Sequence, residues 1–305
     1  MKKVLLATTA LFLTAGVASA EVSFSGTTQV SVSDTNSAGN DLNTHIDFNV
    51  AVSSSTDSGV TMSAGFGYDA GRQVDTADFE LDAEEANETN NSAWTTAAPS
   101  LTIGYNGITI TADGSGVADL YNGDVNSGDL GIAGSMGGLS FGLTTGISNG
   151  DDNSSMSLGY AMGDITASYV STNNSDGRAT DASKISLGYK TGDATITVAS
   201  DDRDDTADAV QSVAVAYSMD AIKVSVSAAS TGASGSSIGD DWDVSVSYTT
   251  GAITASLATD EDSVSKISAS YDLGGGANAF LVNRSGTDGA GANKDFMAVG
   301  LNFAF

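Results

Sequence analysis

The chain has 305 residues, no cysteine, and a formal net charge of −27 at pH 7. So acidic a chain repels nucleic acid, which excludes a nucleic-acid partner, and without cysteine no disulfide can stabilise the fold. The composition includes 36 glycines and a single proline, and with its many Ser, Thr, Val and Ile residues it favours strands joined by tight turns, so we predict an all-β fold.

Residues 1–20 have the pattern of a cleaved signal peptide. Lys2 and Lys3 are followed by a short apolar run from Val4 to Val17 and by the small residues Ala18-Ser19-Ala20. Cleavage would leave residues 21–305 as one mature domain, about two charge units more negative. The apolar run is too short for a spanning helix, and no other stretch offers about 18 consecutive apolar residues.

After the signal, the chain repeatedly places large apolar side chains on one parity and small or polar ones on the other. This is the pattern of strands with two different faces, and the short turns between them predict antiparallel hairpins. Our count gives 18 strands. They are residues 22–33, 42–54, 59–69, 100–105, 108–113, 128–136, 139–148, 154–162, 165–172, 182–190, 194–200, 209–219, 222–229, 241–249, 252–259, 263–272, 277–284 and 296–305.

The connections differ at the two ends of these strands. Turns such as Asn106-Gly107 and Gly192-Asp193 are very short, whereas the connections at the other end are longer and acidic: 70–99, 114–127, 173–181, 201–208, 230–240 and 285–295. This asymmetry is typical of outer-membrane barrels, with short periplasmic turns and long outer loops. We therefore predict a transmembrane antiparallel up-and-down β-barrel that contacts membrane lipid.

Six tyrosines occur on the apolar parity within about four residues of a short turn. An aromatic ring with a polar tip suits the headgroup zone, so these residues predict a periplasmic aromatic girdle. Tyrosines that fill the strand ends of a soluble sheet are the alternative. The six are Tyr105, Tyr160, Tyr189, Tyr217, Tyr248 and Tyr271.

The second face of each strand predicts an aqueous interior. A closed barrel satisfies every backbone group inside the bilayer, and a barrel this wide cannot be filled by its own side chains. Lipid would therefore meet one face and water the other.

Several stretches together resemble the general porins of Gram-negative bacteria, most closely their alphaproteobacterial branch. They are "EVSFSG", "TDSGV", "YNGITITADG", "VADLYNGD", "ASYDLGGGA" and the terminal "VGLNFAF". The resemblance implies homotrimers of 16-stranded barrels in the outer membrane that pass ions and small hydrophilic solutes passively, without catalysis or a cofactor. It also implies that the assembly machinery reads the C-terminal strand with Phe303 and Phe305. The expected strand number is thus 16 to 18.

In this family the third outer loop folds inward and narrows the channel. The matching segment here, 114–127, implies an acidic constriction with Asp113, Asp119, Tyr121 and Asp124, although the loop is shorter than the family pattern.

The opposite wall of such channels is basic. Here only Lys184, Lys223 and Lys266 are inward basic candidates, and His45 and Asp47 share the inward parity of the second strand. Because so few basic residues line this wall, we expect a mild cation preference. The long 70–99 connection could cap the mouth or reach a neighbouring subunit.

Other functions remain as alternatives. Residues 138–142 match the G-x-S-x-G hydrolase pattern, but the only histidine, His45, is on another strand, so we expect no enzyme. A surface or secreted β-rich structural or adhesion protein without a pore is the second alternative. Calcium bound by acidic loops is possible in principle, but no known calcium-loop motif is present, and solvated loops are the expectation.

Overall fold

The computed structural model describes residues 20–35, 39–76, 81, 89–96, 99–121, 128–147, 153–173, 181–204, 206–288, 291 and 293–305. The predicted signal peptide, apart from Ala20, and the constriction residue Asp124 lie outside these ranges. In the described ranges no helix is long and apolar enough to cross a bilayer.

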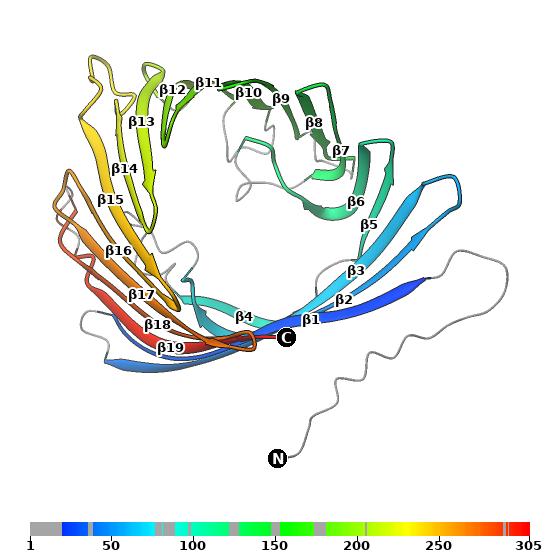
Figure 1. Ribbon diagram of the computed structural model, residues 1–305, viewed down its shortest axis with the longest axis horizontal. Helices are drawn as coiled ribbons and strands as arrows, with labels where there is room; N and C mark the ends of the chain where they lie inside the picture. The colour runs from blue at the N-terminus through cyan, green and yellow to red at the C-terminus, as the bar shows by residue number, and fades with distance from the viewer. Residues whose placement is uncertain are drawn as a thin grey trace.

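The described residues form 19 strands in a single antiparallel sheet (Figure 1). The strands are β1 (Glu21–Thr35), β2 (Asn40–Ser55), β3 (Thr61–Val74), β4 (Thr89–Thr96), β5 (Ser100–Tyr105), β6 (Ile108–Val117), β7 (Gly128–Met136), β8 (Leu139–Thr145), β9 (Ser154–Met162), β10 (Ile165–Asn173), β11 (Ala182–Thr191), β12 (Ala194–Arg203), β13 (Val210–Met219), β14 (Ile222–Ala229), β15 (Asp241–Thr250), β16 (Ile253–Asp260), β17 (Ser265–Gly274), β18 (Ala277–Ser285) and β19 (Phe296–Ala304).

The sheet closes on itself because β1 pairs with both β2 and β19. The closing register runs from Thr27 opposite Ala304 to Thr35 opposite Phe296. The seam continues to the last residue, since Gly26 and Phe305 exchange two backbone hydrogen bonds of 3.0 Å. A ring without an edge leaves no row of unpaired backbone groups for lipid to meet. One closed sheet also differs from the two facing sheets that a soluble sandwich would require.

The closed ring has 18 strands, because β5 pairs with both β3 and β6, whereas β4 pairs only with β3. β4 pairs with the end of β3 that is nearer the long connections, from Tyr68 to Val74. β5 pairs with the end of β3 that is nearer the short turns, from Thr61 to Gly65. Pro99, the only proline, lies between them, and proline has no N–H to donate to a ladder. The count of 18 is confirmed, and the family norm of 16 does not hold for this chain.

Some predicted boundaries were wrong at the outer ends of strands. β3 continues to Val74 and β4 forms within the segment that we expected to be a connection. β6 reaches Val117 instead of Asp113, with irregular pairing between Ala112 and Val117. β12 reaches Arg203. Outer strand ends are polar on both faces, so the apolar alternation fades there before the pairing stops.

The short turns have the backbone that tight hairpins need. Asn106 and Gly107 both have positive φ, 48° and 79°, as do Gly137 and Gly138, 60° and 83°. Two central residues of positive φ match the right-handed twist of the flanking strands.

Candidate functional site: the inner wall and the segments folded against it

The end of β6 turns away from the wall and folds into the ring (Figure 1). We call Ala118–Tyr121 the L3 segment. Thr144 Oγ1 of β8 donates to the carbonyl oxygen of Ala118 at 3.3 Å, and the N–H of Leu120 donates to Ser155 Oγ of β9 at 2.9 Å. The predicted inward course of the third outer connection is therefore visible in its described part, and it rests on the inner faces of β8 and β9.

Two side chains of the L3 segment reach further around the wall. Asp119 is buried and accepts hydrogen bonds from Thr172 Oγ1 of β10 at 2.8 Å and from the N–H of Tyr121 at 2.7 Å. The Tyr121 hydroxyl donates to Asp201 Oδ1 of β12 at 2.6 Å. Arg203 binds the other oxygen of Asp201 through Nη2 at 2.8 Å and Nε at 3.1 Å. The L3 segment is thus hydrogen-bonded to four wall strands, β8, β9, β10 and β12.

The environment of Tyr121 keeps its phenol protonated. Burial and then the hydrogen bond and negative charge of Asp201 raise the pKa of Tyr121 from 10.0 to about 12. At neutral pH the phenol is therefore a permanent donor to the Asp201 carboxylate.

The predicted basic residues are spread along the inner wall. Lys184 on β11 is in register with Asp201 of β12, the residue that accepts the hydrogen bond of the Tyr121 hydroxyl. Lys223 is exposed near the short-turn end of β14, and Lys266 on β17 is in register with Arg284. Asp113 on β6 is partly exposed, beside the start of the L3 segment.

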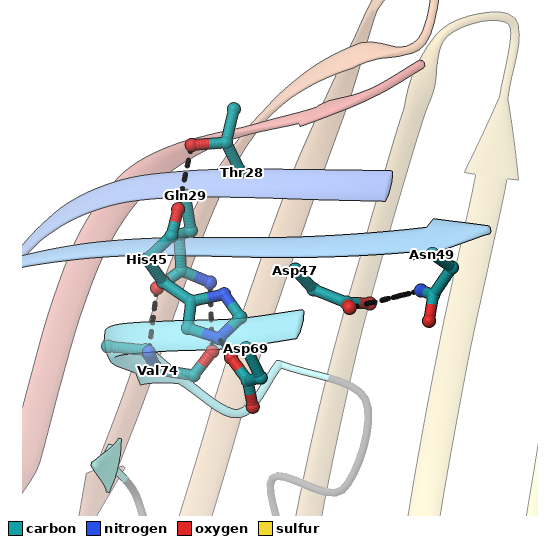
Figure 2. A network of polar contacts seen from close by, with 7 residues as sticks. All are labelled: Thr28, Gln29, His45, Asp47, Asn49, Asp69 and Val74. Atoms are coloured by element: carbon teal, nitrogen blue, oxygen red, sulfur yellow. Dashed lines mark hydrogen bonds and ion pairs between the residues drawn. The ribbon is translucent and has the colours of Figure 1, made fainter. Parts of the chain in front are cut away.

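His45 and Asp47 lie on β2 near a second inward segment (Figure 2). His45 is only 5% exposed; its Nε2 contacts Asp69 Oδ1, and Thr28 Oγ1 donates to its carbonyl oxygen at 2.7 Å. Asn49 Nδ2 donates to both oxygens of Asp47, at 3.0 and 2.9 Å. The inward parity predicted for both residues is consistent with these contacts, but His45 is buried by protein and has little contact with solvent.

The second inward segment begins at Gly71, where β3 departs from β2. Gly71 has φ +100°, and a Cβ there would collide with the carbonyl oxygen of Thr44. Beyond it, Gln29 of β1 binds the backbone of Val74 twice: its Nε2 donates to the Val74 oxygen at 2.9 Å, and its Oε1 accepts the Val74 N–H at 2.6 Å (Figure 2). We call Gly71–Thr76 together with Leu81 the L2 segment.

Sequence reasoning missed Gln29, Asp69, Asp201 and Arg203 as parts of these contacts. A signal existed for Asp201, because it continues the inward parity of Thr195 and Thr197 along β12. We had assigned it to a loop because acidic residues cluster from there to Asp208.

The predicted girdle tyrosines share one environment. All six are between 42% and 50% exposed on the outer face, and each is close to a short turn. Tyr160 is in register with Leu139, and Tyr248 with Ile222. Phe303 and Phe305 are exposed on the same face. The Phe305 ring lies over Gly26, where a Cβ would be 2.8 Å from Phe305 Cζ.

The described residues contain no group of three or more His, Asp or Glu side chains that could hold a metal ion. Of the two acidic runs on which loop-bound calcium would depend, 75–88 lies outside the described residues apart from Asp75, Thr76 and Leu81, and 201–208 lies within them apart from residue 205. Loop-bound calcium therefore stays untested.

Comparisons with a family model and with solved structures support the barrel architecture described above. Residues 7–258 match a family model described as Gram-negative porin. Solved variants of the Rhodopseudomonas blastica porin have a similar fold. Three of them are 17%, 17% and 19% identical to this chain, each with a TM-score of 0.56, covering 93% of this chain and 100% of theirs. No curated protein matches the chain.

The family match extends over most of the strands that build the closed ring. That ring has a lipid-type outer face and a polar interior into which loop segments fold. From these observations we conclude that this chain belongs to the Gram-negative porin family and forms a channel in the outer membrane.

Proposed function

We propose that the channel passes ions and small hydrophilic solutes down their gradients, with a mild preference for cations. The observation that supports this most is the acidic L3 segment: Asp119 lies against the inner wall at Thr172, and Tyr121 binds Asp201, the carboxylate that Arg203 also binds.

The balance of charge along the described inner wall favours the same sign. Arg72 is paired with Asp41 at 2.9 Å, as Arg203 is with Asp201, so a carboxylate balances the charge of each of these two arginines. Asp47 and Asp113 add carboxylates, and the whole chain has 38 acidic against 11 basic residues. Low-dielectric walls focus such a field on permeating ions.

A reversal potential in a potassium chloride gradient across a planar bilayer tests this preference. We expect the sign that corresponds to potassium flux. Asp113→Asn should lower the cation preference and Lys223→Gln should raise it. A wild-type potential with the opposite sign would refute the proposal.

Neutral solutes should also pass, because much of the inner wall is lined by hydroxyl groups. Ser225 Oγ lies 2.6 Å from Ser245 Oγ, and Ser256 Oγ lies 2.5 Å from Ser268 Oγ. Swelling of proteoliposomes in small sugars measures this route, and swelling no faster than that of empty liposomes would count against it.

We propose that the protein has no catalytic activity. Ser140 of the G-x-S-x-G match is on β8 and paired with Gly159, while the only histidine is on β2 and in contact with Asp69. Ester and peptide substrates should remain unhydrolysed by the purified protein, and turnover that is lost in Ser140→Ala would disprove this.

The family resemblance supports two further proposals, a homotrimer and removal of residues 1–20. A cross-linking ladder on native membranes should stop at the trimer. The mass of the exported protein should correspond to a chain that starts at Glu21.

A further inference from the structure

The inner face of β18 and β19 carries a buried apolar patch, which on β18 lies between Asn278 and Arg284. Phe280 and Val282 of β18 and Phe296 and Ala298 of β19 all have the inward parity, opposite to Met297, Val299 and Leu301. All four are at most 4% exposed. Apolar side chains facing a water-filled lumen would be costly, so something inside the ring must cover them.

The L2 segment supplies that cover. Val74, which is 1% exposed, belongs to one buried cluster with Phe280, Val282, Phe296 and Ala298. The two hydrogen bonds from Gln29 fix the backbone of Val74 against β1, next to these strands. Val74 therefore acts as an apolar anchor on the lumen side of the barrel seam.

The same segment continues along the wall. Thr76 borders a groove whose lining includes Thr254 of β16, Ser268 of β17 and Asn278 of β18. Leu81, which is 9% exposed, packs with Ala258 of β16 and with Val264. The described residues of this segment thus contact β1, β18 and β19 through Val74 and β16 through Leu81.

We propose that the L2 segment is a fixed second constriction of this channel, on the wall from β16 to β2, facing the L3 segment on the wall from β8 to β12 (Figure 1). The free cross-section is then limited by two inward segments. Asp75 places a carboxylate on the second segment. Its two anchors, Val74 and Leu81, are buried against the wall of their own subunit.

The proposal depends on the existence of a channel and not on its ion preference. Its position can be tested without conduction, because the chain has no native cysteine. In Val74→Cys combined with Ala298→Cys, a short bifunctional thiol reagent should join the two residues within one chain in native membranes. Val74→Cys combined with Ala216→Cys, an inward position of β13 outside the cluster, is the matched control and should not react.

Links between chains, or no link at all, would overturn the assignment. The joined channel should keep the single-channel conductance of the unjoined one, because the segment is already seated. A large fall in conductance on joining would show that the segment normally lies elsewhere.

Variants that detach Val74 from its buried cluster test whether the L2 segment narrows the pore. Val74→Asp should loosen the L2 segment and raise the single-channel conductance, whereas Ala216→Asp adds the same charge to the lumen and should not. An unchanged conductance in a folded Val74→Asp channel would refute the constriction. If Val74→Asp does not fold, Leu81→Asp provides the same comparison at the second anchor.

Discussion

Neighbouring residues of one strand meet different solvents in this protein, and the difference is set by parity alone. Leu187 of β11 is 51% exposed on the outer face, whereas Ser186 lies between Ser168 and Ala199 on the inner face. Since lipid is the solvent of the outer face, a charge should have opposite consequences at these two positions.

Leu187→Arg should destabilise the folded barrel by about 2–4 kcal/mol, because a charged side chain on the lipid face is costly near the bilayer midplane. Ser186→Arg should leave stability nearly unchanged and alter conductance instead. Urea unfolding in lipid vesicles measures the first effect and planar-bilayer recording the second. If the two results were exchanged, the assignment of faces would be reversed.

The parity of a residue along its strand also allowed individual residues to be assigned to one face from the sequence. The girdle tyrosines and the terminal phenylalanines follow from alternation, and their exposure agrees with it. The hydrogen bond between Tyr121 and Asp201 could not be predicted, because these residues are far apart in the chain and meet only through the path of the L3 segment. No local pattern encodes such a path.

Tyr121 gives a pH dependence at the alkaline end. Its pKa is about 12 when bound to Asp201 and 10.0 as a free phenol, so the fastened state holds its proton more tightly than the released one. The stabilisation is therefore complete below pH 10 and is lost as the pH rises toward 12.

We expect the current noise of the wild-type channel to grow over that interval. Tyr121→Phe removes the hydrogen bond, worth about 1 kcal/mol, and should be noisier already at pH 7, without the added alkaline change. The variant retains every lysine and so controls for their titration. Identical noise profiles in the two proteins would contradict the role of this contact.

At the scale of elements, regular hairpins were predictable and the irregular outer part of β3 was not. Tight turns such as Gly137-Gly138 define the hairpins locally. The 70–99 region contains β4 and the L2 segment, and the L2 segment packs through Val74 on a distant apolar patch of β18 and β19. The inward parity of Phe280, Val282 and Phe296 was the signal available in the sequence. Large apolar side chains are not expected on a wall that only water covers.

Gly71 is the position at which β3 can leave the wall. Gly71→Ala should destabilise the L2 segment, because positive φ costs roughly 1–3 kcal/mol and the new Cβ would also collide with Thr44. Gly59→Ala is the matched control, with φ +85° but open space around it. Protease sensitivity between β3 and β4 should increase in the Gly71 variant and not in the control; equal sensitivity would show that Gly71 is not the hinge of this departure.

At the scale of the whole molecule, the ring must be closed by its first and last strands. These two strands are the farthest apart in sequence of all the strands that pair in the ring. Contacts of such high sequence separation are slow to form. The C-terminal strand completes the wall, and the family resemblance predicts a second, separable task for it, recognition by the assembly machinery.

Phe305→Ser separates these tasks. The backbone hydrogen bonds between residue 305 and Gly26 do not need the ring, so the purified variant should refold into lipid vesicles nearly as well as wild type. In cells, its level in the outer membrane should fall strongly if the terminal aromatic is recognised.

Leu301→Ser is the control, because it also removes an exposed apolar side chain from β19 but leaves the terminus intact. Equal losses of both variants in cells would attribute the effect to the lipid face of the strand. A normal level of Phe305→Ser in cells would remove the terminal ring from the recognition signal. Because refolding in vesicles lacks the machinery, a defect that is confined to cells and to Phe305→Ser arises from recognition and not from closure of the ring.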